Sequence, residues 1–319
     1  MNDIKLSICC ITYNHEKYLK EALEGILLQK VDFDYEVIIS DDCSTDNSQS
    51  IIKSYLPLFK QRVKTFLGTK NIGAIDNYDR AQLCSEGEYV IVLETDDKWT
   101  DPYKLQKQVD YLDSHPEVIA VAHKCKVIDK NSKVINIKYP ECKSKVYTLK
   151  EYKKWIMPGQ TTTIMYRNYH VRDLGIDSIF IKECSQKGPG DRAKVFSLLA
   201  NGEIHCLPDC MSEYRLIKNE GSSFSATNTL TYINYIDYFK IFVDYAKKNL
   251  KMNYIDVANS MYVEAIFAAC FLSREINIKK LRELLHEVKR KKVYLYVVQY
   301  LLHLLKNKII GVITNNEYL

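Results

Sequence analysis

The chain has 319 residues and a mass of 37.2 kDa, which is enough for one large domain or two modest ones with a buried core. Hydrophobic residues make up 46% and charged residues 27%, which excludes disordered, collagen-like and disulfide-rich miniprotein classes. The net charge of +5 is too small to indicate a nucleic-acid partner. Much of the basic character is local, because residues 274–308 carry ten Lys/Arg and three Glu, a net charge of +7.

Ten cysteines raise the question of redox state. Several lie in apolar runs, no C-x-x-C pair occurs, and residues 1–5 lead into a strand-like segment without the pattern of a secretory signal. We therefore expect a reduced, cytoplasmic protein. His205, Cys206 and Cys210 form a loose cluster with no evident fourth ligand, so zinc is only weakly indicated. The longest apolar stretch, 293–305, is shorter than the roughly 20 residues of a spanning helix, so no membrane span is expected.

Strand and helix patterns alternate through the first 122 residues. Near-continuous apolar runs predict strands at 6–12, 36–40, 63–67, 88–93 and 118–122. Helical periodicity predicts helices at 18–27, 46–56, 74–85 and 101–114, with Asn14 capping the first and Asp101-Pro102 starting the last. This alternation is typical of a doubly wound, mostly parallel sheet, and the predicted class is α/β.

The pattern changes after residue 122. We expect a hairpin at 126–137, a short helix capped by Thr148 with Glu151, a polar loop at 217–227, strands at 161–166 and 203–207, and a helix at 191–200. Beyond the loop 217–227, only helices are expected, at 230–249, 254–273, 277–291 and 293–306. We therefore divide the chain into a region 1–227, with halves 1–122 and 123–227, and a helical region 228–319.

Polar residues follow four of the predicted strands at the edge where open α/β sheets bind ligands. They are Thr12-Tyr13-Asn14, Asp41-Asp42, Asn71-x-Gly73 and Asp96-Asp97. Each group alone also fits a turn. Together they indicate one site. The adjacent carboxylates of Asp96 and Asp97 repel by about 4 kcal/mol at about 4 Å near a protein surface, and Mg²⁺ or Mn²⁺ bound with phosphate oxygens would remove that cost.

The ordered motifs resemble those of the family-2 glycosyltransferases. The resemblance covers about residues 5–216 and rests on the following set: Ser7-x-x-x-x-Thr12-Tyr13-Asn14, Asp41-Asp42-x-Ser44-x-Asp46, Asn71-x-Gly73, Gly87-Glu-Tyr-Val and Thr95-Asp96-Asp97-x-Trp99. It implies a GT-A fold and a metal-dependent, inverting transferase that uses a nucleotide-activated sugar. On this reading, 1–122 is the nucleotide-sugar-binding half and 123–227 is the acceptor-side half.

The resemblance also implies roles for single residues. Thr12 and Tyr13 would contact base and ribose, and Asp42 would pair with the base, which is usually uracil. Asp96 would face ribose or metal, and Asp97 would ligate Mn²⁺ or Mg²⁺ on the diphosphate. The remaining donor-site residues would be Asn71, Gly73 and Arg80.

Sugar transfer with inversion needs one general base to accept the proton of the acceptor hydroxyl. The resemblance places this base at Asp191, which follows Gly188-Pro-Gly190 and begins a predicted helix, with Glu183 in reserve. A plain N-cap role for Asp191 stays open. The helix N-terminus is expected to lower the pKa of Asp191 and weaken it as a base.

One feature departs from the family pattern. Many members carry a histidine a few residues after the Tyr-Arg pair, here Tyr214-Arg215, that reaches metal or diphosphate. This chain has Lys218 in that region, which would neutralise diphosphate directly and weaken the metal dependence. The loop 217–227 is either a lid over the donor or a plain linker.

Acceptor recognition and membrane contact are less defined. Trp155 and Thr161-Thr162-Thr163 lie where the family forms its acceptor site, although core and strand roles fit them as well, and Trp99 is expected to pack against the sheet. The basic C-terminal helices either dock on an anionic membrane surface or form a packed appendage, and the Tyr-rich helices at 230–273 offer a dimer face.

We therefore expect an inverting glycosyltransferase that moves sugar from a UDP-sugar to a saccharide or lipid-linked acceptor, in the cytoplasm or at the inner membrane face. The alternatives are a sugar nucleotidyltransferase with Asp-bound Mg²⁺ and a non-catalytic nucleotide-binding module.

Overall fold

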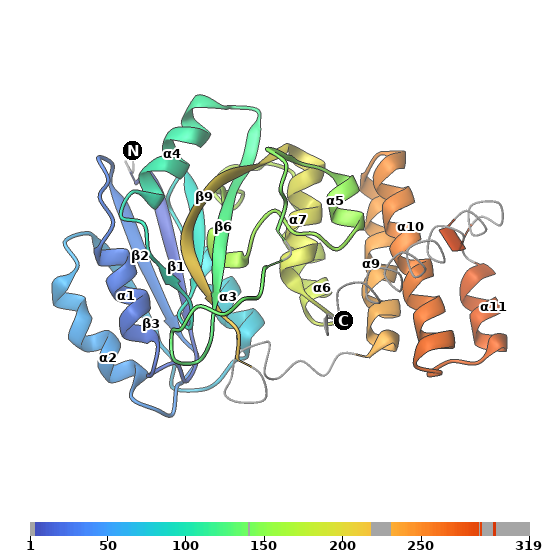
Figure 1. Cartoon of the computed structure of the whole chain (residues 1–319), viewed down its shortest axis with the longest axis horizontal. Helices are drawn as coiled ribbons and strands as arrows, with labels where there is room; N and C mark the ends of the chain where they lie inside the picture. Colours follow the sequence, from blue (N-terminus) through green and yellow to red (C-terminus); the bar gives the residue numbers. More distant parts are fainter. Residues whose placement is uncertain (1–3, 140, 218–230, 287, 289–295, 298–319) are drawn as a thin grey trace. The chain divides into compact units, whose positions relative to one another are not determined.

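The computed structural model describes residues 4–139, 141–217, 231–286, 288 and 296–297 (Figure 1). The chain forms two compact units. The first comprises Met1–Ser178 and Lys194–Asn228, and the second comprises Ile179–Ala193 and Thr229–Leu319. The expected division at residue 227 remains a prediction.

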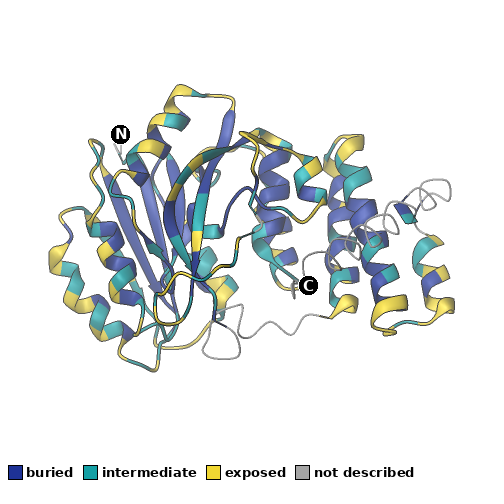
Figure 2. Ribbon diagram, viewed as in Figure 1, coloured by how far each residue is buried: buried dark blue, intermediate teal, exposed yellow. Residues whose placement is uncertain are grey.

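The first unit is built on a mostly parallel sheet of nine strands, which confirms the predicted fold class. Its first half has the order β3-β2-β1-β4, with all neighbours parallel: β1 Leu6–Thr12, β2 Tyr35–Asp41, β3 Arg62–Leu67 and β4 Tyr89–Glu94. Apolar residues on both faces of β1, β2 and β4 make them continuous hydrophobic runs, as expected for strands covered by helices. Figure 2 shows these strands as the buried centre of the unit.

The alternation of side chains along β1 decides which helix covers which face. Ile8 and Cys10 pack in one core cluster with residues of α1 Leu19–Leu27, α2 Ser48–Tyr55 and α4 Lys104–Ser114. Cys9 points to the opposite face, where its thiol donates to the Ala81 carbonyl of α3 Ala74–Leu83 at 3.6 Å. Helices therefore cover both faces, as in a doubly wound sheet.

The second half of the sheet is mixed. β8 Met165–Arg167 is antiparallel to β4 and to β6 Val118–Ile128, and β9 Glu203–Arg215 runs parallel to β6 with register shifts. Two short strands pair antiparallel with β9, β5 Lys98–Trp99 and β7 Val146–Tyr147. Trp99 is buried and its indole donates to the Thr162 carbonyl, so it packs against the sheet as predicted.

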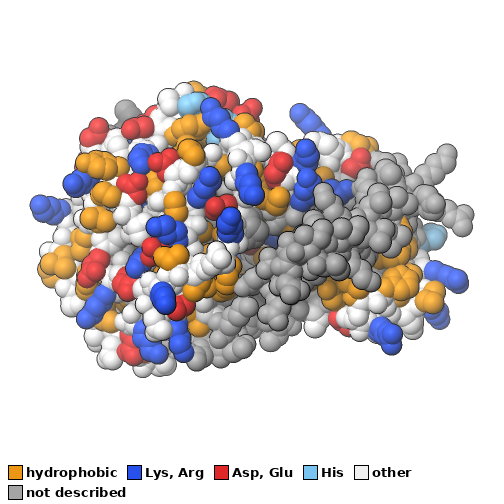
Figure 3. All heavy atoms as spheres, in the orientation of Figure 1, with side chains coloured by type: hydrophobic (Ala, Val, Ile, Leu, Met, Phe, Trp, Pro, Cys, Tyr) orange, Lys and Arg blue, Asp and Glu red, His pale blue; other side chains and the backbone are white. Residues whose placement is uncertain are grey.

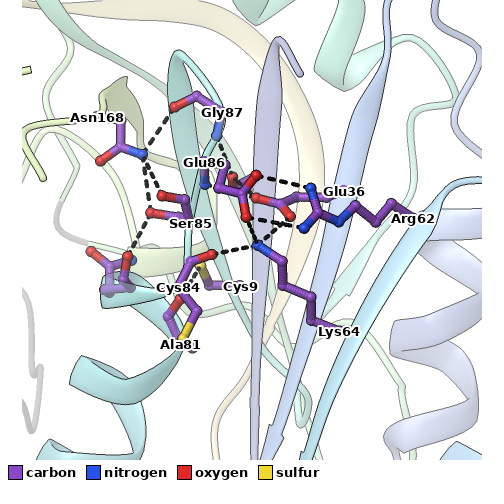
Figure 4. A network of polar contacts seen from close by, with 12 residues as sticks. Cys9, Glu36, Arg62, Lys64, Ala81, Cys84, Ser85, Glu86, Gly87 and Asn168 are labelled. Carbon is purple, nitrogen blue, oxygen red and sulfur yellow. Dashed lines mark hydrogen bonds and ion pairs between the residues drawn. The ribbon is translucent and has the colours of Figure 1, made fainter. Parts of the chain in front are cut away.

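A polar network fixes the amino edge of the sheet, opposite the strand ends that carry the motifs (Figure 4). The buried Glu36 carboxylate accepts from Ser7 Oγ and the Glu86 amide and pairs with Lys64 Nζ at 2.9 Å. The Gly87 amide donates to Ser7 Oγ, and a Cβ at Gly87 would lie 2.6 Å from the backbone of Leu6 and Ser7. Gly87 therefore lets β4 approach β1 closely, which gives this family motif a structural role.

Several boundaries differ from the sequence-based expectations. Asn14 does not cap α1: it adopts a positive φ and its side chain accepts from the Thr45 amide, while Tyr18 precedes the helix. The expected strand 161–166 is a 3-10 turn, Thr161–Thr163, followed by β8. The expected hairpin at 126–137 is present in a short form. The chain turns at Asp129–Ser132, an antiparallel bridge joins Ile128 to Val134, and the Ile135 amide donates to the Val127 carbonyl at 2.9 Å. The capping box of Thr148 and Glu151 is confirmed at α5 Leu149–Lys153.

The described part of the second unit is helical, as expected. It contains α6 Ser178–Ser185, which the sequence analysis missed, the start of α7 Gly190–Asn201, α9 Tyr232–Asn249, α10 Met252–Phe267, a π-helical turn Ala268–Leu272 and α11 Ile278–His286. Aromatic rings form its core, with Phe180 stacked on Tyr245 and edge-on to Phe242. Lys218 and most of the loop 217–227 lie outside the described residues, as does the expected helix 293–306 apart from residues 296–297, which are helical.

One helical stretch among the described residues, Met252–Leu272, is long and apolar enough to cross a membrane by composition alone. The sequence analysis did not single it out. Within the protein, 61% of its most apolar window is buried, as in the core helix of a helical bundle.

Candidate functional site

The carboxyl ends of β1, β2 and β4 lie side by side and are joined by backbone hydrogen bonds. The Asp42 amide donates to the Thr12 carbonyl at 3.1 Å, and the Thr95 amide donates to the Ile11 carbonyl at 3.1 Å. The predicted strand-end groups therefore lie along one edge of one sheet, where doubly wound folds bind their ligands.

The loop after β1 is bound tightly to the loop after β2. Ser44 Oγ accepts from the Asn14 amide, and Asp46 accepts from the Glu16 amide and from Ser48. Although partial burial opposes it, these donors lower the pKa of Asp46. Asp41 is fully buried and accepts from Ser44 and Gln49 Nε2. Asp41, Ser44 and Asp46 thus shape the edge.

Asp42 is the second acidic residue of this motif and has a different set of partners. Its two carboxylate oxygens accept from the amides of Ile72 and Gly73 at 2.7 and 2.9 Å, and its carbonyl accepts from Asn71 Nδ2. Gly73 has φ 90° and ψ 154°, a conformation that non-glycine residues rarely adopt. The structure therefore brings together Asp42, Asn71 and Gly73, three of the predicted donor-site residues.

Two further predicted residues flank this group. Arg80 donates to Ser40 Oγ, the Asp41 carbonyl and Asn77 Oδ1, so its guanidinium is held beside the end of β2. Thr12 is buried, and its Oγ1 has no hydrogen-bond partner among the described residues. An unsatisfied buried hydroxyl is uncommon and fits a position that a bound molecule completes. Tyr13, next along the chain, is partly exposed.

Asp96 and Asp97 follow β4 and differ in their surroundings. Asp97 is buried, and its two oxygens accept from Gln160 Nε2 at 2.9 Å and from the Arg215 amide at 2.7 Å. Burial and the neighbouring carboxylates of Asp96 and Glu94 raise the pKa of Asp97 well above its usual value. No donor from the described part of the chain binds the Asp96 carboxylate. Asp96 therefore has more freedom than Asp97 to contact a cation.

Arg215, at the end of β9, connects this acidic group to the rest of the unit. Its buried guanidinium donates to the carbonyls of Asp96 and Asp129, to Ser132 Oγ and to Glu21 Oε2, and lies 4.2 Å from the centre of the Tyr18 ring. One side chain thus fixes the turn that carries Asp96 and Asp97 against α1 and the 129–132 turn. The resemblance marked the Tyr-Arg pair, but sequence reasoning gave it no such role.

The described residues contain no group of three or more His, Cys, Asp or Glu side chains placed to hold a metal ion. Both ring nitrogens of His205 are engaged, by Tyr111 and Glu203, and Cys206 donates to the Pro158 carbonyl, so the loose His205–Cys206–Cys210 cluster is not arranged as a zinc site. All ten cysteines are free thiols. At the strand edge, Asp96 with Glu94 and Asp97 nearby suits a cation that takes its other ligands from phosphate and water.

Sequence reasoning missed two polar residues of this edge. Glu94, two positions before Asp96, accepts from Gln160 Nε2 at 3.2 Å. The acid-x-acid spacing of Glu94 and Asp96 in the sequence could have indicated Glu94 as a site residue. Gln160 carries no motif, and only the fold places it beside Asp97.

Asp191 is the second residue of α7 and belongs to the second unit. Burial raises the pKa of its carboxyl, although the Arg192 charge and the hydrogen bond from the Arg192 amide oppose the shift. The expected lowering by the helix N-terminus is therefore wrong, because desolvation outweighs it. A raised pKa makes Asp191 a stronger base. Glu183 is an exposed residue of α6.

The sheet order and the polar cluster at its carboxyl edge are those expected of a GT-A-type α/β protein. The model of glycosyl transferase family 2 matches residues 7–174, more than half of the chain, and the chain belongs to this family.

Curated relatives share short segments with it. The protein TuaG of Bacillus subtilis, described as "Putative teichuronic acid biosynthesis glycosyltransferase", is 32% identical over 107 residues, 34% of this chain and 41% of that protein. An uncharacterized protein of Mycobacterium tuberculosis is 45% identical over 123 residues, 39% of this chain and 36% of its own. The chain thus aligns with about a third of the length of that relative.

A solved structure extends the likeness in fold. The Staphylococcus aureus enzyme TarS, residues 1–349 in complex with UDP-GlcNAc, matches with a TM-score of 0.61 and 20% identity, covering 89% of this chain and 79% of that chain. This match confirms the predicted GT-A fold.

Proposed function

We propose that this chain is an inverting glycosyltransferase that moves a sugar from a UDP-sugar to a hydroxyl of a saccharide or lipid-linked acceptor in surface polysaccharide synthesis. One observation carries the proposal. The Asp42 carboxylate, held by two amides of the Ile72–Gly73 turn, lies on the same edge as the Asp96 carboxylate, which has no protein donor among the described residues. TuaG and TarS support the product class, and UDP-GlcNAc bound to TarS supports the donor class.

In this proposal, one group of residues at the edge binds the nucleoside and another faces the diphosphate. Asp42, Thr12, Tyr13 and Asn71 hold the nucleoside, with Asp42 pairing to the base, while Gly73 and Arg80 keep the turn and the end of β2 in place. Asp96 faces the diphosphate side. These assignments follow the family pattern and the contacts described above.

A divalent cation, Mn²⁺ or Mg²⁺, supplies Lewis-acid stabilisation of the departing diphosphate when bound. The residues present fit such an ion, and we assign the direct contact to Asp96, with Glu94 beside it. Asp97 holds the turn through Gln160 and the Arg215 amide, and its expected role as a direct ligand of the ion remains a prediction. Lys218 as a partial substitute for the ion remains a prediction.

Asp191 is proposed as the general base that accepts the proton of the acceptor hydroxyl, with Glu183 in reserve. A desolvated carboxylate with a raised pKa is better suited to this task than an exposed one. We further propose a cytoplasmic location, at the membrane surface if the C-terminal helices dock there. The family membership gives no support to the nucleotidyltransferase alternative.

The first test is thermal stabilisation of the protein by UDP, GDP, CDP and dTDP, with and without Mn²⁺. A ligand at 100 times its Kd stabilises by about 2.7 kcal/mol. We expect selective stabilisation by UDP, increased by Mn²⁺, and Asp96→Asn should lose the increase but keep the UDP response. Equal responses to all four nucleotides would contradict the assignment of Asp42 to the base.

The second test separates an enzyme from a binding module. Asp191→Asn should bind UDP as tightly as the native chain but transfer sugar at least about 100-fold more slowly, because the general base is lost. Glu183→Gln is the matched variant. If Glu183→Gln abolishes transfer and Asp191→Asn does not, the base is Glu183.

A further inference from the structure

The acceptor-side half contains a second concentration of positive charge, between residues 124 and 154. This segment has ten Lys, three Asp or Glu and no Arg, a net charge of +7, so the remainder of the chain carries −2. Below it is called the lysine segment, and its lysines are Lys124, Lys126, Lys130, Lys133, Lys138, Lys143, Lys145, Lys150, Lys153 and Lys154.

Most of these lysines are exposed, and several lack an ionic partner. No salt bridge within the described part of the chain involves Lys126, Lys138, Lys143, Lys145 or Lys154. Elsewhere in the same unit, basic residues form ion pairs, as do Lys5 with Glu88, Lys64 with Glu36, Lys98 with Glu213 and Lys107 with Asp209. The segment keeps a net charge of +7 after its three acidic residues are counted, so it suits an anionic partner.

The lysine segment is part of the sheet and of its covering layer. β6 and β7 both pair with β9, and the Lys145 carbonyl accepts from the Cys206 amide of β9 at 2.7 Å. α5 follows directly. In Figure 3, Lys and Arg side chains are spread over the visible face, with Asp and Glu side chains among them. The pairing of β6 and β7 with β9 holds two parts of the lysine segment in the sheet.

This surface begins beside the proposed donor site. Arg215 donates to Asp129 and Ser132, in the turn that holds Lys130, and to the Asp96 carbonyl. Aromatic rings lie between the charges. Tyr139 packs edge-on against Tyr214, with ring centres 5.5 Å apart, and Trp155 is 37% exposed next to Lys154. Aromatic faces between cations suit a chain that alternates apolar sugar or polyol faces with anionic groups.

We propose that the lysine segment binds the acceptor, a linear glycan or polyol polymer with repeated phosphodiester groups, and guides its end toward the donor edge. This inference rests on the proposed function and names its substrate class. The ammonium group of lysine binds phosphate as a point charge, so ten lysines suit repeated phosphodiester groups, and a polycarboxylate probe tests this choice. The number of lysines, spread from β6 to α5, suits a polymer better than a single phosphate.

The binding test uses the full chain and a synthetic oligo(glycerol phosphate) as probe, with neutral dextran, polygalacturonate, single-stranded RNA and phosphatidylserine vesicles for comparison. We expect the oligo(glycerol phosphate) to bind best and its affinity to fall steeply with salt, because binding releases counterions. Absence of binding, or equal binding of dextran, would overturn the proposal. So would tighter binding of polygalacturonate, RNA or vesicles, which would assign the surface to that partner instead.

A matched pair of variants locates the binding surface. Lys143→Glu with Lys145→Glu changes two exposed side chains without a salt bridge, and we expect it to weaken oligo(glycerol phosphate) binding at least about tenfold. Lys53→Glu with Lys60→Glu makes the same change in net charge on exposed residues in α2 and just after it, and should alter binding less than about twofold. Equal weakening by both pairs would show a nonspecific charge effect and overturn the proposal.

Nucleotide binding separates this proposal from the proposed function. Both variant pairs should keep the native stabilisation by UDP. UDP could fail to stabilise the native chain while the polymer still binds through Lys143 and Lys145. In that case the proposed donor is wrong and the proposed role of the lysine segment is supported. If UDP stabilises the chain but the Lys143 and Lys145 changes leave polymer binding unaltered, the proposed role of the lysine segment is wrong and the donor assignment is supported.

Discussion

At the scale of single residues, the site depends on side chains that fix the backbone beside it. Asp42 binds two amides of a turn, and Arg215 binds two carbonyls, a hydroxyl and a carboxylate. Neither arrangement can be read from the sequence, because each joins residues 30 to 194 positions apart. The strand-end motifs indicate where polar residues gather. Only the fold shows what each of them binds.

We expect Arg215→Lys to lower the free energy of unfolding by about 2–3 kcal/mol, because one ammonium group cannot reach the Asp96, Asp129 and Glu21 oxygens together. Denaturant unfolding measures the change. Arg172→Lys, at the exposed ion pair with Glu88, is the control and should cost less than about 1 kcal/mol. Similar losses in both variants would contradict the role given to Arg215.

Asp42→Asn tests the contact between the Asp42 carboxylate and the Ile72–Gly73 turn. The amide group of asparagine would direct a donor at one of the two backbone amides, which leaves that amide unsatisfied and costs about 1–3 kcal/mol. We expect UDP stabilisation to be lost as well. Ile72→Ala, at a partly exposed side chain of the same turn, should keep the UDP response. Retention of full UDP binding by Asp42→Asn would argue against base pairing.

At the scale of elements, the parallel half of the sheet was predictable and the second half was less so. Continuous apolar runs locate β1, β2 and β4 to within about two residues, because strands buried on both faces carry few polar residues. β6 and β9 are longer than predicted, since their later residues mix buried and partly exposed positions and include Lys, Asp and Glu. β5 and β7 have two residues each and carry no periodic signal.

Gly87→Ala should destabilise the sheet itself, because the added Cβ would lie 2.6 Å from the Leu6–Ser7 backbone and push β4 away from β1. We expect a loss of about 2–4 kcal/mol in thermal unfolding. Gly73→Ala is the informative comparison. No atom lies within 4 Å of its added Cβ, so only the backbone strain of a positive φ, about 1–3 kcal/mol, should appear, together with weaker UDP binding. A neutral Gly87→Ala would show that the strands can separate freely.

At the scale of the whole molecule, buried basic groups make stability depend on pH. Lys194 lies 3.2 Å from the Tyr166 hydroxyl and 4.3 Å from the centre of the Tyr78 ring, and burial lowers its pKa to about 7. Below pH 7 the folded and unfolded chains both carry this proton, and the folded state bears the full cost of the buried charge. Between pH 7 and about 10.5 only the unfolded chain retains the proton, so the free energy of unfolding should rise with pH.

Lys194→Met isolates this effect. It should remove a slope of up to about 1.4 kcal/mol per pH unit between pH 7.5 and 9.5, and should be more stable than the native chain at pH 7. Lys53→Met, at an exposed position, should leave the slope unchanged. Urea unfolding at several pH values gives the comparison. Identical slopes for the native chain and Lys194→Met would mean that Lys194 remains charged in the folded protein.

The position of β9 has a consequence for how the chain is made. β9 lies between β6 and the short strands β5 and β7, and its last residue, Arg215, binds Glu21, 194 positions earlier. A ribosome releases the chain from the N-terminus, so β1 to β4 can pair long before residue 215 emerges. Until then the edge of β6 is open and Asp96 has no guanidinium beside it. The turn that carries Asp96 and Asp97 is therefore expected to become fixed late during synthesis, after roughly two thirds of the chain has been translated.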